Sequence, residues 1–447
     1  MRTHAPLTIR TAALFFIPLI LTTELHQLSH SVVQAFLARL GDPTITLAAF
    51  SIAFSFNTVF SSVISVAAQA GLSFITDKRS FWRLGRFYFW FSLIPFFIIE
   101  VVALTSLGDW LFGEMIGASA EVTRLAKPAS AVMGLWIIPN QVRNLATALC
   151  LKQRRTILLS HATTLRLISQ AVMLMALPFL MEGAVAGAAS LVGAMTVEAA
   201  YLYVVTRYIY AELPKDSGHQ ASYRQIWGFS WPLMVTTASE NGVPFVINFF
   251  LGRLVNPDLA LAAFGVVNAL KSLIVSPLRN LVQTTQALVQ SREDMRVMLR
   301  FTHWLALIYV VVVGILFYTP MREVVLNGIM GLRSDLSAYA TPAVRMILLV
   351  AIVWGYSSLF RGLLSAMRRT RSIAATAVIR LVVVVAVGSI TLLEPGLNGA
   401  VVGVAAVGAA FLVEAVLLGW QVSRFSKVPG PLFASEIDQA AGRGAGH

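Results

Sequence analysis

The sequence predicts an all-α polytopic membrane protein, with twelve transmembrane helices in two parallel six-helix repeats around a central cleft. Three observations support this fold class: an apolar composition, an internal repeat and an even number of apolar segments per repeat. Of the 447 residues, 57% are hydrophobic and 12% are charged. A soluble domain carries about 25% charged residues, so this chain has too few to cover a surface in water. Long continuous apolar runs are typical of membrane helices rather than of barrel strands.

The internal repeat relates the two halves of the chain at a constant offset of 214 residues. Residues 18–50 align with residues 232–264, and both segments start with Pro and end with Leu-Ala-Ala-Phe. Far downstream, the same offset still pairs Pro128 with Pro342. Duplicated bundles that meet at a cleft, here an inverted V, are a common architecture of secondary transporters.

Apolar runs between charged residues and Gly or Pro breaks predict the spans in order, each longer than the roughly 20 residues that a membrane helix needs. The first half gives residues 11–38, 44–70, 84–106, 124–150, 156–180 and 184–206. The second half gives residues 226–252, 258–282, 298–319, 338–364, 372–393 and 397–423. Because six is even, the second half enters from the same side as the first, and the repeats are parallel.

The distribution of Lys and Arg predicts the orientation. With the N-terminus inside, inner segments hold 21 of these residues and outer loops hold 6. The positive-inside rule therefore puts both termini in the cytoplasm, and we expect a multi-pass protein of the cell inner (plasma) membrane. The predicted domains are an N-terminal bundle (1–206), a cytoplasmic linker (207–225), a C-terminal bundle (226–424) and a disordered cytoplasmic tail (425–447).

Charged residues inside the spans are the first candidates for function, since a charge at a helix centre costs about 2.5–3.5 kcal/mol on insertion scales. The repeat pairs Arg166 with Arg380, and an offset of 216 pairs Glu198 with Glu414. This symmetry predicts one structural Arg–Glu ion pair in each half. A substrate or proton site remains the alternative for these four residues.

A polar stripe runs along the first span of each half. Gln27, His30 and Gln34 share one helix face, and Asn241 and Asn248 continue the stripe in the second half. Such a stripe faces water or protein rather than lipid, so we expect it to line the cleft, with interhelical hydrogen bonding as the alternative. Histidines here could carry protons, and their spacing predicts no metal site.

The two halves differ at several polar positions. By the repeat rule Asn57 corresponds to Lys271, and Arg143 corresponds to Ser357. Packing alone would treat the halves alike, so these differences predict an asymmetric, basic cleft. The full set of predicted cavity residues is Glu24, Gln27, His30, Asn57, Arg143, Glu240, Asn241, Asn248, Lys271 and Arg361.

In the interior of the predicted spans, seven cations stand against five carboxylates, and five against three remain once the two symmetric Arg–Glu pairs cancel. This excess of cations favours anionic substrates. The chain has no ATP-binding G-x-x-x-x-G-K-[ST] loop and no nucleophile–base arrangement, so we expect neither an enzyme nor a cofactor. Protons or Na⁺ would drive transport through Glu24, Glu240 or a histidine. Despite a net charge of +13, the basic residues are spread over short loops, which excludes nucleic acid as a partner. We expect a monomer whose partners are lipid and a small anion.

The chain resembles the progressive ankylosis (ANK) family, within the multidrug/oligosaccharidyl-lipid/polysaccharide (MOP) flippase superfamily with its MATE-like fold. The resemblance rests on Ile17-Pro18-Leu19, Ala53-Phe54-Ser55, Phe229-Ser230-Trp231-Pro232-Leu233, Val246-Ile247-Asn248, and Gly399-Ala400 with Glu414. It implies export of small polyvalent anions such as pyrophosphate, nucleotides or citrate-like carboxylates. The major facilitator superfamily has the same repeat order, but its basic loop is only loosely echoed by residues 77–79.

Three other functions stay open. Glu24 and Glu240 depart from the pattern of a pure anion site and would suit an H⁺- or Na⁺-coupled multidrug antiporter for organic cations. A lipid-linked saccharide flippase is a second alternative within the superfamily. A membrane scaffold without transport is the third, although intramembrane charge is costly for a scaffold.

Overall fold

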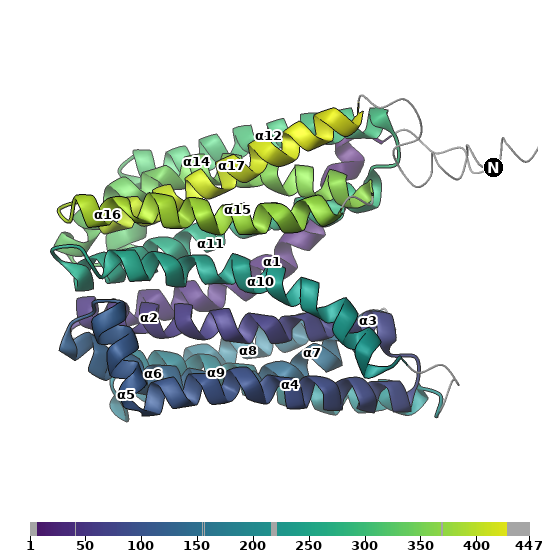
Figure 1. Ribbon diagram of the computed structural model, residues 1–447, viewed down its shortest axis with the longest axis horizontal. Helices are drawn as coiled ribbons and strands as arrows, with labels where there is room; N and C mark the ends of the chain where they lie inside the picture. Colours follow the sequence, from purple (N-terminus) through teal and green to yellow (C-terminus); the bar gives the residue numbers. More distant parts are fainter. Residues whose placement is uncertain are drawn as a thin grey trace, which may run out of the picture.

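The computed structural model describes residues 7–40, 42–153, 155, 157–215, 221–367 and 370–426. These residues form helices joined by short turns and contain no strand (Figure 1). The all-α fold class is therefore confirmed for the described part of the chain. The predicted tail from residue 427 onward and residues 216–220 of the predicted linker lie outside it.

The long helices follow the predicted order of spans. The first half contains α1 (Ile9–Leu37), α2 (Pro43–Ser61) with α3 (Ala67–Phe74), α4 (Lys78–Leu104), α6 (Ala120–Gly134) with α7 (Ile137–Lys152), α8 (Ile157–Ala176) and α9 (Gly183–Glu212). The second half contains α10 (Tyr223–Leu251), α11 (Pro257–Leu288), α12 (Arg292–Tyr318), α14 (Ser334–Ala366), α15 (Thr370–Gly388) with α16 (Ile390–Leu393), and α17 (Gly399–Ser426). Short α5 (Ser106–Gly108) and α13 (Met321–Glu323) each lead into a π-helical turn, Asp109–Met115 and Val324–Ile329.

Nine helices of the described residues are long and apolar enough to cross a membrane, so the chain is a multi-pass membrane protein. Helix α1, the α6–α7 pair and α10 lie where the first, fourth and seventh spans were expected, and the count of twelve stays a prediction. The link between the halves is shorter than the predicted 207–225. Helix α9 continues to Glu212 and α10 starts at Tyr223, because polar residues extend a helix beyond its apolar part.

Local sequence explains where several helices start. Pro43 and Pro257 occupy the first turns of the equivalent helices α2 and α11, where a missing N–H costs nothing. Asp77 accepts a hydrogen bond from the backbone N–H of Ser80, whose hydroxyl accepts one in return from the Asp77 backbone. This capping box opens α4, and Ser222 forms the same motif at the start of α10.

Helices α1 and α10 connect the two halves. Figure 1 shows the remaining helices of each half gathered in two groups, with α1 and α10 running obliquely between them. The start of α1 packs on the second half, where Phe16 and Phe301 meet edge to face at 5.6 Å. The start of α10 packs on the first half, where the hydroxyls of Tyr88 and Ser230 are 2.7 Å apart. Each first helix is therefore anchored in the opposite half.

One end of the molecule is closed by contacts between the halves. We call this end, which carries α5 and α16, the far face, and the end where α1 starts and α17 finishes the terminal face. At the far face, Gly117 has a φ of 87° and its backbone touches that of Gly252, so that a Cβ on either would collide with the other's chain. The backbone N–H of Ser119 donates to Asp258 across the same junction at 3.2 Å.

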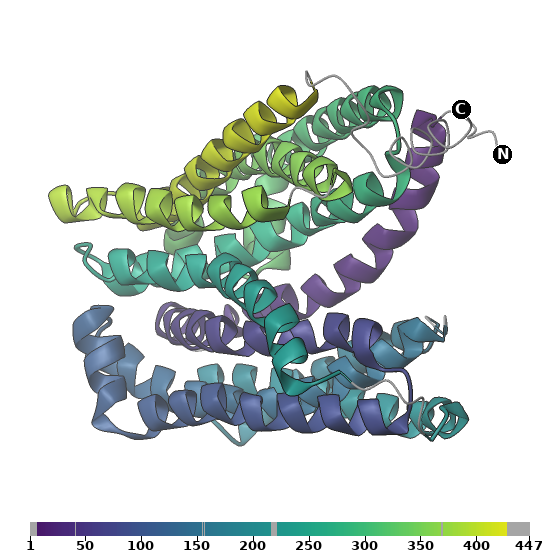
Figure 2. The same cartoon turned by 45° about the vertical axis from the view of Figure 1, so that its right-hand side comes forward.

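A second far-face contact involves the end of α1. Arg39 donates hydrogen bonds to the carbonyls of Gly328 at 2.7 Å and Ile329 at 2.6 Å, at the end of the π-helical turn in the second half. At the terminal face the two helix groups diverge instead (Figure 2). The structure is therefore closed at the far face and splayed at the terminal face.

Candidate functional site

A cavity of about 430 Å³ lies between the two halves. Helices α1, α2, α6, α7, α8 and α9 of the first half and α10, α11, α14 and α17 of the second contribute its walls. Its lining runs from Phe54 and Lys271, near the middle of their helices, to Ser65 and Arg279, nearer the terminal face. The cavity thus occupies the predicted position of the cleft between the repeats.

Seven of the ten predicted cavity residues line it: Gln27, His30, Asn57, Arg143, Glu240, Asn241 and Lys271. The polar stripe on α1 and α10 therefore faces the cavity in part. His30 stacks on Phe54 with ring centroids 4.1 Å apart. Among the described residues, no group of three His, Cys, Asp or Glu side chains could hold a metal ion. Whether the lining residues bind a substrate stays a prediction.

Three predicted cavity residues lie elsewhere. Asn248 is fully buried and donates to the hydroxyl of Ser55 at 2.8 Å, so its amide joins α10 to α2 on the closed side of the cavity. Glu24 accepts a hydrogen bond from Ser276, because α1 leans against α11 of the opposite half. Arg361 is held behind Glu240 by a short double contact with Glu414.

The first half contains a buried ion cluster around Glu198. Arg166 approaches Glu198 at 3.4 Å, as the repeat predicts, and Arg143 approaches the other carboxylate oxygen at 3.0 Å. The Glu198 side chain is only 2% exposed, whereas Arg143 is 22% exposed. Arg143 therefore lines the cavity, as predicted, and is at the same time paired with a buried glutamate.

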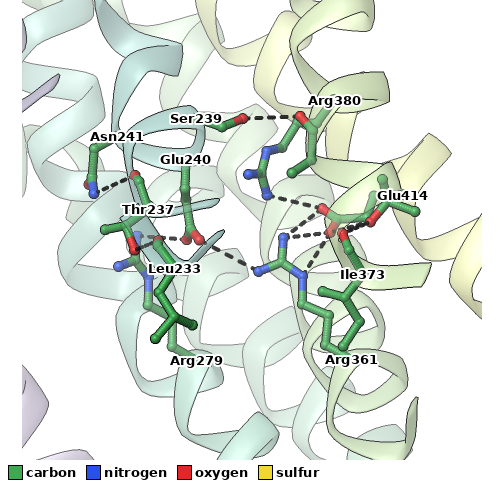
Figure 3. Close-up of polar contacts among 12 residues, drawn as sticks. Leu233, Thr237, Ser239, Glu240, Asn241, Arg279, Arg361, Ile373, Arg380 and Glu414 are labelled. Carbon is green, nitrogen blue, oxygen red and sulfur yellow. Dashed lines mark hydrogen bonds and ion pairs between the residues drawn. The ribbon is translucent and has the colours of Figure 1, made fainter. Parts of the chain in front are cut away.

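The second half contains a longer ion chain in the order Arg279, Glu240, Arg361, Glu414 and Arg380 (Figure 3). Arg361 donates two hydrogen bonds of 2.7 Å to Glu414, and Arg380 approaches Glu414 at 3.3 Å. Glu240 is 3.4 Å from Arg279 and 3.6 Å from Arg361. The predicted ion pair of Arg380 with Glu414 is present. The ion chain continues from this pair through Arg361 to Glu240 and Arg279, which line the cavity.

The sequence difference between Arg143 and Ser357 has a different meaning from the one we predicted. Arg143 and Arg361 differ by four residues in repeat register, which is about one helical turn or 6 Å along the axis. Each nevertheless reaches the glutamate of its own last helix, Glu198 or Glu414. The arginine side chain is long enough to compensate for the shift of one turn. The two halves therefore differ in sequence at this point but form equivalent ion pairs.

Lys271 and Arg279 are charged cavity residues that have no charged equivalent in the first half. Lys271 donates to Asn268 at 2.6 Å, and its amino group is 5.9 Å from the Trp354 ring centroid. The Arg279 guanidinium is 5.3 Å from the same ring and its side chain is 43% exposed. Their repeat equivalents, Asn57 and Ser65, carry no charge.

Sequence reasoning missed Arg279 and Trp354 as cavity residues. Arg279 lies near a helix end, where snorkelling to the membrane surface explained it equally well. The available signal was the change from Ser65 to Arg279, about two helical turns beyond Lys271 on the same helix. Trp354 stacks on Phe411 at 3.8 Å, and a buried aromatic pair of this kind has no sequence signature.

Comparison with known proteins agrees with this architecture. The family model described as MatE matches residues 232–390. An inward-facing multidrug resistance MATE family transporter of the MOP superfamily has a TM-score of 0.71 at 16% identity, covering 90% of this chain and 96% of that chain. The eukaryotic MATE transporter AtDTX14 has a TM-score of 0.66 at 14% identity, with 93% and 95% covered.

A third similar structure is the MATE multidrug transporter DinF-BH in complex with a small-molecule ligand, with a TM-score of 0.63, 15% identity and 92% and 95% of the two chains covered. No curated protein sequence gives a significant match. At these identities the similarity establishes the fold, and the narrower resemblance to the ANK family stays a prediction. The chain therefore has the fold of the MATE transporters of the MOP superfamily, and its second half also matches the MatE family model.

Proposed function

We propose that this protein is a secondary transporter that works by alternating access and exports or exchanges small polyvalent anions. The terminal face is the cytoplasmic face of the inner membrane in this proposal. The substrates in this proposal are those that the resemblance to the ANK family implies, such as pyrophosphate, nucleotides or citrate-like carboxylates. Protons or Na⁺ supply the driving force, with Glu24 and Glu240 as candidate carriers.

The charge of the cavity wall carries the proposal. Arg143, Arg166, Lys271 and Arg279 line the cavity, and Glu240 is the one carboxylate in its described lining. The other two glutamates of the ion clusters are buried, at 2% and 1% exposure. Anions entering the cavity therefore meet more positive than negative charge at close range, which attracts them and repels cations.

Transport of labelled citrate and pyrophosphate into proteoliposomes tests the substrate class. We expect counterflow of at least one of these anions with wild-type protein, and a loss of about tenfold or more in Lys271→Ala, because the amino group is a direct cavity charge. Arg124→Ala removes an exposed cation outside the cavity and should retain wild-type counterflow. Absence of counterflow with every anion, or unchanged rates in Lys271→Ala, contradicts the proposal.

A multidrug antiporter for organic cations is the second candidate. Similarity in fold to MATE multidrug transporters and the presence of Glu240 on the cavity wall favour it. In that case Glu240→Gln would abolish efflux of a cationic rhodamine dye, while Lys271→Ala would leave efflux intact or raise it. The two variants therefore respond in opposite ways under the two functions.

A further inference from the structure

Glu240 is held more loosely than the other glutamates of the ion clusters. Its two oxygens go to different arginines, Arg279 at 3.4 Å and Arg361 at 3.6 Å. Both distances exceed the 2.7–2.9 Å or so of a charge-assisted hydrogen bond. Arg361 makes its short bonds, at 2.7 Å, to Glu414 instead. Glu414 is thus the permanent partner in this chain, and Glu240 is the exchangeable one.

The surroundings of Glu240 would suit any small anion. Without its carboxylate, Arg279, Arg361 and Arg380 would face Glu414 alone, which leaves an excess of two positive charges in the membrane interior. Guanidinium groups bind carboxylate and phosphate oxygens in paired hydrogen bonds. Lys271 adds a further cation, since it shares the Trp354 ring with Arg279.

Glu240 also lies on the helix that couples the two halves. The start of α10 is bound to the first half by the Tyr88–Ser230 hydrogen bond. Near Glu240 the same helix is bound to the second half, where Ser239 donates to the carbonyl of Ala377 at 3.1 Å. Rocking of the halves against each other pulls on α10 and so shifts Glu240 relative to Arg279 on α11 and Arg361 on α14.

We propose that Arg279 and Arg361 form the binding subsite for a carboxylate or phosphate group of the substrate, and that Glu240 is a built-in counter-ion which the substrate displaces. This proposal rests on the proposed anion transport. In the empty protein Glu240 pairs with both arginines and lowers the excess positive charge of the ion chain from two to one. An arriving anion takes its place and breaks the link that Glu240 makes from α10 to α11 and α14, which permits the halves to move. Glu240 sets the affinity for the substrate and the charge that the moving protein carries.

Equilibrium binding of labelled citrate and labelled pyrophosphate to purified, full-length protein tests this role. We expect Glu240→Gln to bind the preferred anion about tenfold more tightly than wild type, a difference of about 1.4 kcal/mol, because the competitor is gone. The rate of anion exchange in proteoliposomes should fall in the same variant, because the anion dissociates from the site more slowly. Arg279→Gln should weaken binding by about tenfold or more. Whether citrate or pyrophosphate responds identifies the kind of anionic group.

Two further variants keep the test decisive. Glu182→Gln makes the same chemical change at an exposed site and should bind as wild type does. Glu240→Asp shortens the side chain by one methylene and should give intermediate affinity, and it decides the matter if Glu240→Gln fails to fold. Equal or weaker anion binding in folded Glu240→Gln, or in Glu240→Asp, overturns the counter-ion role. If wild-type protein binds neither anion, the proposed function itself fails, and rhodamine binding lost in Glu240→Gln would identify a cation site.

Discussion

The N-terminal and C-terminal halves build the same buried ion cluster from residues at different spacings. In each half, a glutamate of the last long helix holds two arginines, Arg143 and Arg166 in one case and Arg361 and Arg380 in the other. The glutamates are almost fully buried in both halves. A cluster that survives a one-turn shift of one member is under structural constraint, so we assign the ion pairs of Glu198 and Glu414 to stability. Arg361 has a second role in our proposal, because its guanidinium also reaches Glu240 and the proposed anion subsite.

The halves differ in what lies between the cluster and the cavity. The second half adds Glu240, Arg279 and Lys271, whereas the equivalent positions of the two cations are Ser65 and Asn57. This added layer lines the cavity, which Arg143 and Arg166 of the first half also reach. Comparison of the halves therefore separates the ion pairs that both halves share from the cavity charges that only the second half carries.

Loss of the glutamate at the centre of each ion cluster, Glu198 or Glu414, should lower the stability of the protein most. We expect the loss to be larger in the first half. Glu198→Gln removes the carboxylate that Arg143 and Arg166 share, and breaking a buried ion pair on one side costs about 3–5 kcal/mol. Glu414→Gln should cost less, because Arg361 keeps Glu240. Thermal unfolding of the two purified variants measures the difference. Equal melting temperatures, or a lower one for Glu414→Gln, would show that Glu240 does not support the second cluster.

The far-face junction offers a second contrast between the halves. Gly252 touches the chain at Ile116 and Gly117, whereas the equivalent residue of the first half is Ala38. We expect Gly252→Ala to cost about 1–3 kcal/mol of far-face closure through overpacking. In a Cys150→Ala background, a reporter Ser119→Cys should then react faster with a membrane-impermeant maleimide. Ala38→Gly, which removes a methyl group, is the control and should leave labelling unchanged.

The equivalence of the two clusters can be tested by moving one arginine by a helical turn. Arg361→Thr leaves Glu414 with Arg380 alone, and we expect a marked loss of stability. Adding Ser357→Arg copies the register of the first half and should recover about 1–2 kcal/mol of that loss. Unfolding midpoints of the single and double variants measure the recovery. No recovery at all would mean that the two clusters are not interchangeable.

The helical fold and the symmetric pairs were predictable because they depend on apolar runs and on repeat register, both of which are written in the chain. The partners of Arg143 and Arg361 were not predictable, because the long flexible side chain of arginine can contact a partner one helical turn away. The sequence pattern also predicts the order of the helices but not which helices pack against each other. The placement of Asn248 and Glu24 against the opposite half therefore followed only from the oblique paths of α10 and α1.

The smallest difference should appear at the corners where the last helices begin. In the first half the corner is held by Arg124 and Glu182 at 3.0 Å, with both side chains more than half exposed. In the second half, Asn398 donates to the carbonyl of Tyr339 at 2.8 Å and accepts from the backbone of Val401.

An exposed ion pair contributes about 0–1 kcal/mol and is screened by salt, whereas loss of a capping amide costs about 1 kcal/mol. Arg124→Ala should therefore lower the unfolding midpoint less than Asn398→Ala does, and its small effect should vanish in high salt. Unfolding curves of both variants at low and high ionic strength check this order. A larger effect of Arg124→Ala that persists in salt would mean that the first half relies on this corner for its packing, and that the ion cluster around Glu198 is not its main constraint.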